Sequence, residues 1–597
     1  MIEEVIWGIS VGGWITILTM FSIFVVMAKS NIPAEVSFLG ALTILLVTGI
    51  VTDEEGMAGF SSEPVVVNAA FFVIIAGLIQ TGVLYWLTQN VLGNARNFGW
   101  AIVKLMIPTS ILAAFLNSSN IVSLFIDAVN IWSRKLNISP SKLLMPLSYA
   151  APLGGLCTLL GSSSTLLVAG LDRTETGHSM DIFAPMLPGI ILTLLGMLLV
   201  VIMQRFIPER ESSEVSFEAT SDYTVELLVP TDNPHVMETV EEAGLFNPKG
   251  GSLIEIMHFD REIVMPVPKD EYIMGGDRLI YAGQINDLLE LKRTHGLAAA
   301  DHHVWSINEI DTKRRMRTAY VTFGSELIGK SMNNCDFERK NNVALVAVAR
   351  QGHRVEGLPR EISLEAGDSL LLECPSKGES QLEENNRRSL KFFDSQFVPQ
   401  LGFKTILSAI VLTLMFLASS FHVLSLISSA MLAAGVLMMM GCCRINDVTK
   451  YIEWDLLLIL GSTVVFSVAI AKTGVASFVA TSVLDICGTN PYVIMVVMCL
   501  LASVVSEFIS DVGAAAVFFP IMYRQAVLLD CDPMPFVMSL MLSVTLSFAS
   551  PIGSSTHMLV YGPGSFRFTD FARLGIVMHM VLLPVMLIIV NLLYPMR

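Results

Sequence analysis

The sequence predicts a polytopic α-helical membrane protein whose two membrane halves flank a polar α+β insert of two small modules. Of its 597 residues, 53% are hydrophobic and only 15% charged, with a mean hydropathy of +0.63. Apolar runs long enough to span a bilayer recur on both sides of one polar stretch. The predicted domains are residues 1–207, 216–300, 308–380 and 398–597.

Eight apolar runs have about the 17 to 25 residues that a membrane-spanning helix needs. They lie at 12–28, 34–51, 65–88, 183–204, 404–420, 423–442, 455–471 and 574–595. The amino-terminal residues MIEEVIWG lack the basic region of a cleaved signal peptide, so we expect the first run to remain in the mature protein.

Composition and motifs exclude several classes of function. A formal net charge of −16 argues against nucleic acid as a partner. The eight cysteines form no CxxC pair, so neither a disulfide framework nor a zinc site is predicted. The segment GSSST at 161–165 lacks the Gly-Lys of a phosphate-binding loop. We therefore expect no enzyme, no catalytic residues and no resident cofactor.

A polar group of residues interrupts an apolar stretch at Ser506–Pro520, SEFISDVGAAAVFFP. A charged side chain near the bilayer centre costs about 2.5 to 3.5 kcal/mol, so Glu507 and Asp511 need a compensating role. The simple alternatives are that Glu507 reaches the membrane interface and that Asp511 caps a buried helix. The favoured prediction is a re-entrant hairpin at 494–525, matched by one at 101–132.

Shifting the second half back by 393 positions aligns more than hydropathy. Pro533 then falls on Pro140, Ser510-Asp511-Val512 on Asn117-Ser118-Ser119, and PIGSSTH at 551–557 on GSSST at 161–165 with a one-residue slip. A polar break, a proline and a Gly-Ser cluster in the same order predict an internal repeat. Such repeats with paired broken helices are typical of secondary transporters that bind substrate near the bilayer midplane.

Basic residues beside the spans predict the orientation. On one side of the first half lie Lys29, Arg96, Lys104, Arg134, Lys135, Lys142, Arg205 and Arg210, whereas the other side has Arg173 among many acidic residues. Because Lys and Arg are retained in the cytoplasm, the insert is expected to be cytosolic. The second half then runs in the opposite direction, as an inverted repeat, although its own charges agree only weakly.

The hairpin tips and the helix breaks that follow them are the candidate site. Free N–H groups at helix amino termini attract anions, and free carbonyl and side-chain oxygens suit sodium. The alternative is that these small residues only let helices pack closely. The predicted substrate-binding residues are Asn117, Ser118, Ser119, Ser163, Ser164, Ser510, Asp511, Val512, Ser555, Thr556 and His557.

The insert contains its own repeat, offset by about 91 residues. GGDRLIYAG at 275–283 matches AGDSLLLEC at 366–374, and SLIEIMH at 252–258 matches ALVAVAR at 344–350. Each copy is expected to begin with a strand, continue with a short helix and end with paired strands closed by a Gly-Asp turn, in which Gly takes a positive φ. His302-His303, between the copies, is read as linker rather than as a metal site.

The segments FLNSSN, ISPSKLLMPLSYAAPLGGLCTLLGSSS and SEFISDVGAAAVFFPI, together with SFASPIGSSTHMLVYGPGSFRFTDF, resemble the divalent anion:sodium symporter superfamily, which includes citrate-transporter-like permeases. The insert resembles a tandem pair of the carboxyl-terminal regulatory modules of potassium-uptake proteins. The resemblance covers both membrane halves. It implies an elevator-type, often dimeric, sodium-coupled symporter for sulfate or a dicarboxylate in the plasma membrane.

The resemblance also implies which residues hold sodium. In the family each tip carries Ser-Asn-Thr, so Asp511 stands here in place of a neutral Asn, and His557 stands where the family usually has Asn. The sodium ligands carried over are Asn117, Ser118, Gly161, Ser506, Ser510 and Asp511.

Asp511 leaves three alternatives open: it holds sodium, it titrates with His557, or dianion transport has been lost. The corresponding functions are a sodium symporter, a proton-coupled or exchange transporter, and a transporter-like nutrient sensor. The insert is expected to sense an unknown ligand, or else to serve as a dimer contact.

Overall fold

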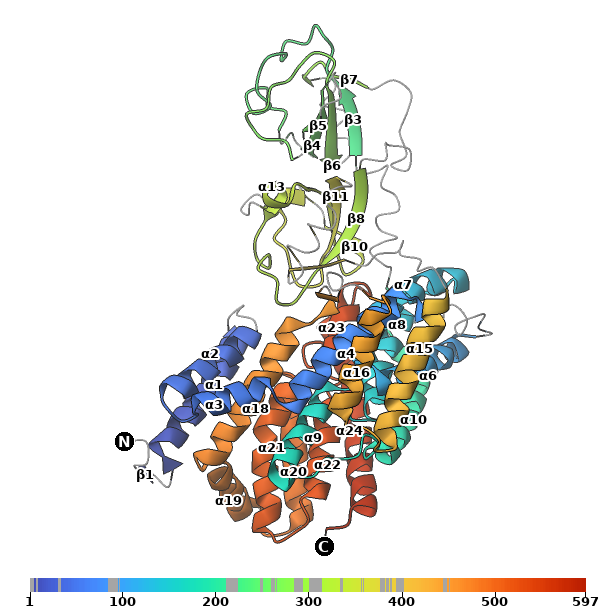
Figure 1. Cartoon of the computed structure of the whole chain (residues 1–597). Coiled ribbons are helices and arrows are strands. Elements are labelled where there is room, and N and C mark those ends of the chain that lie inside the picture. Colours follow the sequence, from blue (N-terminus) through green and yellow to red (C-terminus); the bar gives the residue numbers. More distant parts are fainter. Residues whose placement is uncertain are drawn as a thin grey trace.

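The computed structural model shows a helical membrane part with an α+β insert standing on one end of it (Figure 1). It describes residues 5–596 except 7–8, 30–33, 84–94, 96, 211–223, 247, 249–250, 259–262, 265, 284–293, 300–313, 333–336, 356, 358, 376–381, 383–385, 387–388, 393–401, 444–447 and 450. His302-His303 and Arg96, which carried sequence predictions, lie outside the described residues.

The first half begins with two paired antiparallel strands of two residues each and continues with helices. Its elements are β1 (Val5–Ile6), β2 (Ile9–Ser10), α1 (Val11–Lys29), α2 (Ala34–Val47), α3 (Asp53–Phe60), α4 (Glu63–Gln80), α6 (Phe98–Phe115), α7 (Ser118–Leu136), α8 (Pro140–Gly155), α9 (Ser163–Thr176), α10 (Met186–Ile202) and the 3₁₀ turn η1 (Met203–Phe206).

The second half has the same kinds of elements in a similar order. They are α15 (Phe403–Ser420), α16 (Leu426–Met439), α18 (Trp454–Lys472), α19 (Val475–Cys487), α20 (Pro491–Ser506), α21 (Asp511–Leu528), α22 (Met534–Thr545), α23 (Ser555–Tyr561) and α24 (Phe568–Leu593).

The helices confirm the hydropathy prediction in part. Each of the eight apolar runs contains a described helix, namely α1, α2, α4, α10, α15, α16, α18 or α24, but of these only α4, α10, α15, α18 and α24 are long and apolar enough to span, and α6, which was predicted as part of a hairpin, is so as well. Among the described residues six helical stretches are long and apolar enough to cross a bilayer, and a seventh candidate is the pair α19–α20, which bends by 117°. The chain is therefore a multi-pass membrane protein.

Each of the two stretches predicted as hairpins contains two helices separated by a short polar break. α6 ends where Leu116 takes an extended conformation, and α7 begins after Asn117, whose side chain accepts the N–H of Ser119 at 3.0 Å. α20 is followed by a break at 507–510, and α21 begins after Ser510, whose hydroxyl accepts the N–H of Gly513 at 3.1 Å. The tip residues thus cap the amino termini of α7 and α21.

The insert contains two five-stranded antiparallel sheets of the same strand order. The first, β5-β4-β6-β3-β7, and the second, β10-β9-β11-β8-β12, differ only in the numbering of equivalent strands. Their strands are β3 (Thr224–Leu228), β4 (Gly251–Met257), β5 (Ile263–Val264), β6 (Arg278–Gly283), β7 (Ala298–Ala299), β8 (Arg314–Val321), β9 (Ala344–Arg350), β10 (His353–Arg354), β11 (Ser369–Pro375) and β12 (Leu390–Phe392).

The predicted Gly-Asp turns are confirmed in both sheets. Gly276 and Gly367 have φ angles of +93° and +85°. Asp277 and Asp368 accept backbone N–H groups three residues earlier, at 2.7 and 2.8 Å. The expected helix is present in the second copy as α13 (Phe337–Asn341). In the first copy residues 240–244 form successive turns, and Gly244 there has a φ of +68°; the residues equivalent to α13 lie partly outside the described residues.

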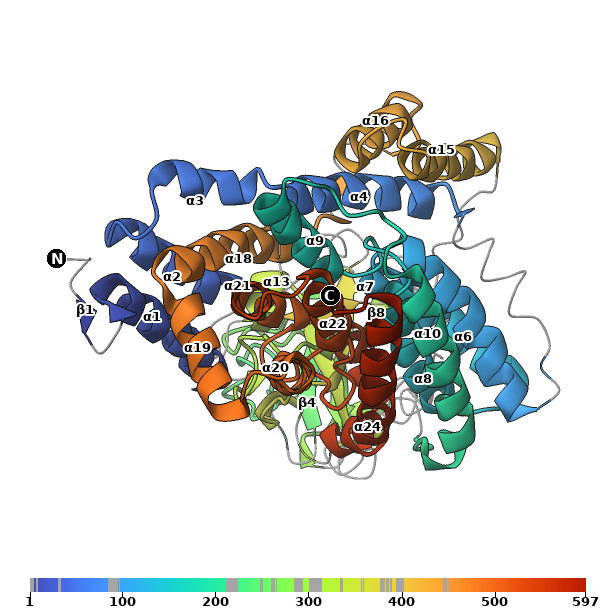
Figure 2. The same ribbon diagram turned by 90° about the horizontal axis from the view of Figure 1, so that it is seen from below.

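The second sheet lies between the membrane part and the first sheet (Figure 1). Apolar residues join the two sheets, among them Ile254 of β4 and Ala347 of β9. Seen from below, α21 and α22 lie near the centre of the membrane part, and α15 with α16 lies at its edge (Figure 2). Arg210 lies where the chain leaves the membrane part for the insert, and it forms an ion pair of 2.8 Å with Asp570 of α24.

Candidate functional site

The tip of the first hairpin is held by oxygen atoms of the helix break that follows it. Ser118 Oγ donates to the carbonyl oxygens of Ala151 and Gly161, at 3.1 and 3.0 Å. Asn117 Nδ2 lies 3.4 Å from Ser163 Oγ. A Cβ on Gly161 would lie 2.5 Å from the Ala113 carbonyl oxygen, so only glycine fits this approach.

The end of the second hairpin is held by a carboxylate. Glu507 accepts the backbone N–H groups of Ala549 and Ser550, at 2.8 and 2.7 Å. Gly553 packs against this end, because a Cβ there would lie 2.9 Å from the Glu507 Cα. Glu507 therefore satisfies two donors that the break between α22 and α23 leaves free, and it does not need to reach a membrane interface.

The two helix breaks share one local geometry. Ser162 precedes α9 with φ −134° and ψ 142°, and Ser554 precedes α23 with φ −131° and ψ 128°. In each break the hydroxyl oxygens of residues i and i+2 lie 2.8 Å from each other, those of Ser162 and Ser164 in the first and of Ser554 and Thr556 in the second. These pairs correspond under the alignment of GSSST with GSSTH.

Contacts between the halves bring the tips and the opposite breaks together. Ser119 Oγ of the first tip lies 2.5 Å from Ser555 Oγ of the second break. The Asp511 carboxylate of the second tip accepts the hydroxyls of Ser162 and Ser164 of the first break, at 3.2 and 3.1 Å. The helices α7, α9, α21 and α23 begin at Ser118, Ser163, Asp511 and Ser555. Four helix amino termini therefore converge on one hydroxyl-rich region.

This convergence has a direct electrostatic consequence. Each helix amino terminus carries partial positive charge and unpaired N–H groups. The Asp511 carboxylate lies beside the amino terminus of α9, where it accepts hydrogen bonds from the hydroxyls of Ser162 and Ser164. Its negative charge therefore offsets part of this positive potential. The predicted site residues include no Lys or Arg, so the positive potential that these residues themselves supply is that of their backbone dipoles.

His557 lies apart from this region. Its ring is fully buried and packs against Tyr149 and Phe571, with centroid distances of 4.8 and 5.1 Å. Neither ring nitrogen has a hydrogen-bond partner in the part of the chain that the structure describes. Because residues two positions apart point to opposite sides of a helix, α23 cannot direct Ser555 and His557 to the same place. The structure thus does not pair His557 with Asp511.

The other predicted residues take different environments. Asn117, Ser118, Ser119, Ser163, Ser164 and Asp511 make the contacts described above. Ser510 caps α21, Thr556 is buried and bonds Ser148 O at 3.2 Å, and Ser555 is exposed. Val512 is a buried apolar side chain. Ser506 Oγ bonds Ser503 O of its own helix at 2.8 Å.

Two residues at the site, Thr545 and Glu507, were not among the predicted binding residues, and a third, Ser162, was predicted only as part of the helix break. Ser162 and Thr545 take part in the hydroxyl network of the first break, where Thr545 Oγ1 lies 3.3 Å from Ser164 Oγ. Glu507 holds the second break. Ser162 stood inside the GSSST signal, whereas no local pattern marks Thr545, the last residue of α22.

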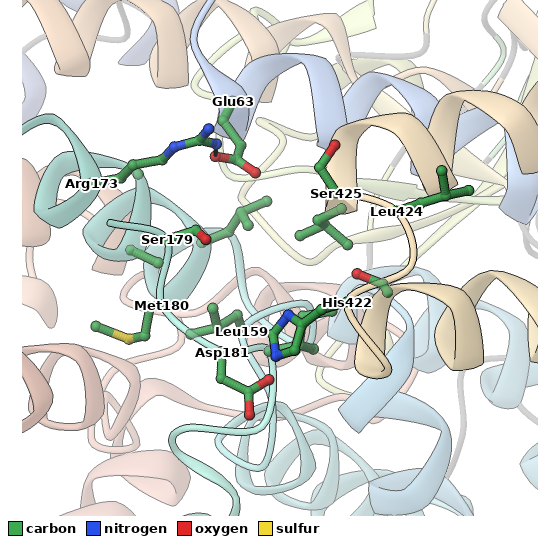
Figure 3. A pocket seen from close by; sticks show the side chains of 15 residues that line it. Glu63, Leu159, Arg173, Ser179, Met180, Asp181, His422, Leu424 and Ser425 are labelled. Carbon is green, nitrogen blue, oxygen red and sulfur yellow. Dashed lines mark hydrogen bonds and ion pairs between the residues drawn. The ribbon is translucent and has the colours of Figure 1, made fainter. Parts of the chain in front are cut away.

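A cavity of about 90 Å³ lies at the far end of α9 (Figure 3). It is bounded by the ion pair of Glu63 and Arg173 and by the loop between α15 and α16, which contributes His422. A Cβ on Gly170 would lie 2.6 Å from Pro64 Cγ. α9 and the start of α4 are therefore in close contact beside this cavity.

The chain matches the family model described as Citrate transporter over residues 22–427 and 410–597. It is 26% identical over 97% of both chains to an uncharacterized transporter of Synechocystis sp.. It is 25% identical to a putative sulfur deprivation response regulator of Chlamydomonas reinhardtii, over 93% of this chain and 97% of the relative. With sodium/sulfate cotransporter 1 of the same alga it shares 27% identity, over 59% of this chain and 42% of that protein.

Proposed function

This chain belongs to the citrate transporter family of anion transporters, and we propose that it carries a divalent anion, sulfate or a dicarboxylate, by sodium-coupled symport. The observation that carries the proposal is the convergence of the amino termini of α7, α9, α21 and α23. Such termini bind anions through free N–H groups and aligned dipoles. Two relatives are named as sodium/sulfate and sodium-dependent dicarboxylate transporters.

Asp511 supports the coupling to a cation. A unit charge about 4 Å from an anionic substrate contributes roughly 4 kcal/mol of repulsion at an effective dielectric constant of 20. A sodium ion bound between them removes that repulsion and provides attraction to both. In the second half, oxygen ligands for sodium come from Asp511, Ser510 and Ser506. In the first half they come from Asn117 and Ser118 of the tip and from the Gly161 carbonyl of the break. Substrate then contacts the exposed Ser555 and the neighbouring Ser119, Ser163 and Ser164.

We further propose that the two halves are inverted repeats and that transport is an elevator movement. The matched geometry of the two breaks supports the repeat. In the movement, the hairpins with α8, α9, α22 and α23 slide against a scaffold that includes α4, α15 and α16. We also propose that the insert lies in the cytosol, and the contact of Ser141 Oγ with Pro208 O, at 3.0 Å, supports this. That contact puts the basic α7–α8 connection beside the exit to the insert.

Uptake into proteoliposomes tests the proposal. Labelled sulfate, succinate and citrate are offered with an inward sodium gradient, with a proton gradient, and with neither. We expect sodium-driven uptake of at least one anion, with loss in Ser119→Ala and Ser555→Ala. Uptake that follows the proton gradient and ignores sodium would favour the proton-coupled or exchange alternative, which then needs a proton acceptor other than an Asp511–His557 pair.

A transporter-like sensor is the second candidate function. It is favoured by the relative named as a putative sulfur deprivation response regulator, which matches over 93% of this chain, and by the contact of the insert with α23, where the rings of Phe323 and Tyr561 lie 4.8 Å apart. Binding of an anion by the purified protein, without uptake under either gradient, would support the sensor and contradict symport.

A further inference from the structure

We propose that the second module of the insert regulates the candidate site through α23, because this short helix contacts the module at one end and the site at the other. α23 has seven residues, Ser555–Tyr561. Ser555 contacts Ser119 of the first tip, and Tyr561 contacts the module. At 1.5 Å per residue the two ends are only about 10 Å apart, so a displacement of Tyr561 moves the residues at the site.

The docking contact is close and involves both partners. The Tyr561 ring packs edge-on against Phe323 of the module, with centroids 4.8 Å apart. A Cβ on Gly367 of the module would lie 2.7 Å from the Tyr561 ring. A Cβ on Gly562 would lie 2.8 Å from the ring of Tyr320. Two glycines, one from each side, therefore allow the module and the end of α23 to approach.

A polar contact extends this surface to the next helix. Arg567, the residue before α24, donates from Nε to Gln351 Oε1 at 2.6 Å. Figure 1 shows the second sheet directly above α23, with the first sheet on its far side. The second module is thus the part of the insert that is placed to act on the membrane part.

The module holds the surface that Tyr561 contacts in a fixed conformation. Arg350 binds the Asp368 carboxylate through Nε and NH2, both at 2.8 Å, and the Ser363 carbonyl at 2.7 Å. Asp368 in turn accepts the Glu365 N–H. The hydrogen bond to Asp368 raises the pKa of the Arg350 guanidinium, so the clamp stays charged. Arg350 is therefore a positioning residue for Gly367.

The first module supplies an internal control. Its turn has the same backbone bonds: Gly276 N donates to Val229 O at 2.8 Å, as Gly367 N donates to Val321 O at 2.8 Å. Both glycines have positive φ. Since φ is +93° at Gly276 and +85° at Gly367, an alanine strains both turns, and at position 367 its Cβ also meets Tyr561.

A ligand that binds the insert can change the affinity of the candidate site for its anion only if it binds more tightly to one conformation of the module–α23 contact than to another. Couplings of this kind usually change affinity by about 5- to 150-fold. The inference rests on the proposed function for its transport measurement alone. Hydrogen exchange of α23 measures the coupling independently of any transported anion.

The test compares Phe323→Ala and Gly367→Ala with Gly276→Ala in the full-length protein. Phe323 lies outside the apolar core of the second module, so its loss should leave the sheet folded, which exchange in β9 and β11 checks. We expect both second-module variants to raise amide exchange in residues 555–561. They should also change the KM for the transported anion about fivefold or more, whereas Gly276→Ala leaves α23 at the wild-type exchange rate.

The inference is overturned if α23 exchanges as in the wild type in Phe323→Ala and Gly367→Ala, or if Gly276→Ala alters it equally. Should Gly367→Ala unfold the module, Gly562→Ala disturbs the same contact from the membrane side, because its Cβ would lie 2.8 Å from the Tyr320 ring at an ordinary φ of −67°. Its effect on KM should be reduced by adding Tyr320→Ala, which removes the ring atoms, and an unreduced effect would count against the contact. If no anion is transported, the proposed function fails while the exchange result still decides this inference.

Discussion

The hydroxyl groups of Ser119 and Ser555 lie 2.5 Å apart although 436 positions separate them in the chain. This contact joins the first hairpin tip to the second helix break, and Asp511 joins the second tip to the first break. The candidate site is therefore formed only where the two halves meet. Variants that touch contacts between the halves should affect binding, and variants within one break should affect stability first.

Replacing Asp511 by Asn should change the cation dependence of uptake more than the protein yield. The amide keeps the size of the side chain and its contacts with the hydroxyls of Ser162 and Ser164, but it removes the charge that we assign to sodium. We expect the sodium concentration for half-maximal uptake to rise about tenfold or more, the equivalent of about 1.4 kcal/mol. Uptake with unaltered sodium and pH dependence would show that Asp511 is not part of the cation site.

Adding a methyl group at Gly161 should destabilise the protein. The new Cβ would lie 2.4 Å from the Gly155 Cα and 2.5 Å from the Ala113 carbonyl oxygen, and backbone cannot move aside as a side chain can. Overpacking of this kind costs about 1 to 3 kcal/mol, which thermal unfolding in detergent measures. Gly40→Ala in α2 is the matched control because nothing lies within 4 Å of its Cβ. Equal unfolding midpoints for both variants would contradict the close approach.

Glu507→Ala should lower the unfolding midpoint more than Glu507→Gln. Alanine leaves the N–H groups of Ala549 and Ser550 without their carboxylate acceptor, and a buried unsatisfied donor costs about 1 to 3 kcal/mol. Glutamine retains one oxygen that can accept. If Glu507→Ala is as stable as the wild type yet loses uptake, the side chain acts on the substrate or cation instead.

A cysteine pair at Pro64 and Gly170 should trap the transporter in one state. These positions bring α4 into close contact with α9, and the elevator movement requires α9 to slide past α4. Oxidation should abolish uptake in the double variant and reduction should restore it, with each single variant as a control. A pair at Thr81 and Ser408, whose hydroxyls lie 2.8 Å apart on two helices of the proposed scaffold, should transport in either redox state. Inhibition of both pairs by oxidation would argue against the proposed division.

The sequence by itself determined the elements of this protein. Each of the eight apolar runs contains a described helix, the strands of the insert lie where alternation placed them, and Gly276 and Gly367 take the positive φ expected of their turns. Asn117 and Ser510, predicted at the two tips, precede helices that their side chains cap. These properties depend on a residue and its near neighbours, and so a pattern in the chain is enough to predict them.

The tertiary structure alone decided which of these elements meet. Sequence patterns placed Asp511 and His557 in one site. In the structure the orientation of α23 directs the His557 ring toward Tyr149, whereas Asp511 bonds Ser162 and Ser164. The part that Glu507 plays and the contact of Phe323 with Tyr561 were equally invisible in the chain. The physical reason is that such contacts depend on the packing of whole helices and sheets against each other. No local propensity records that packing.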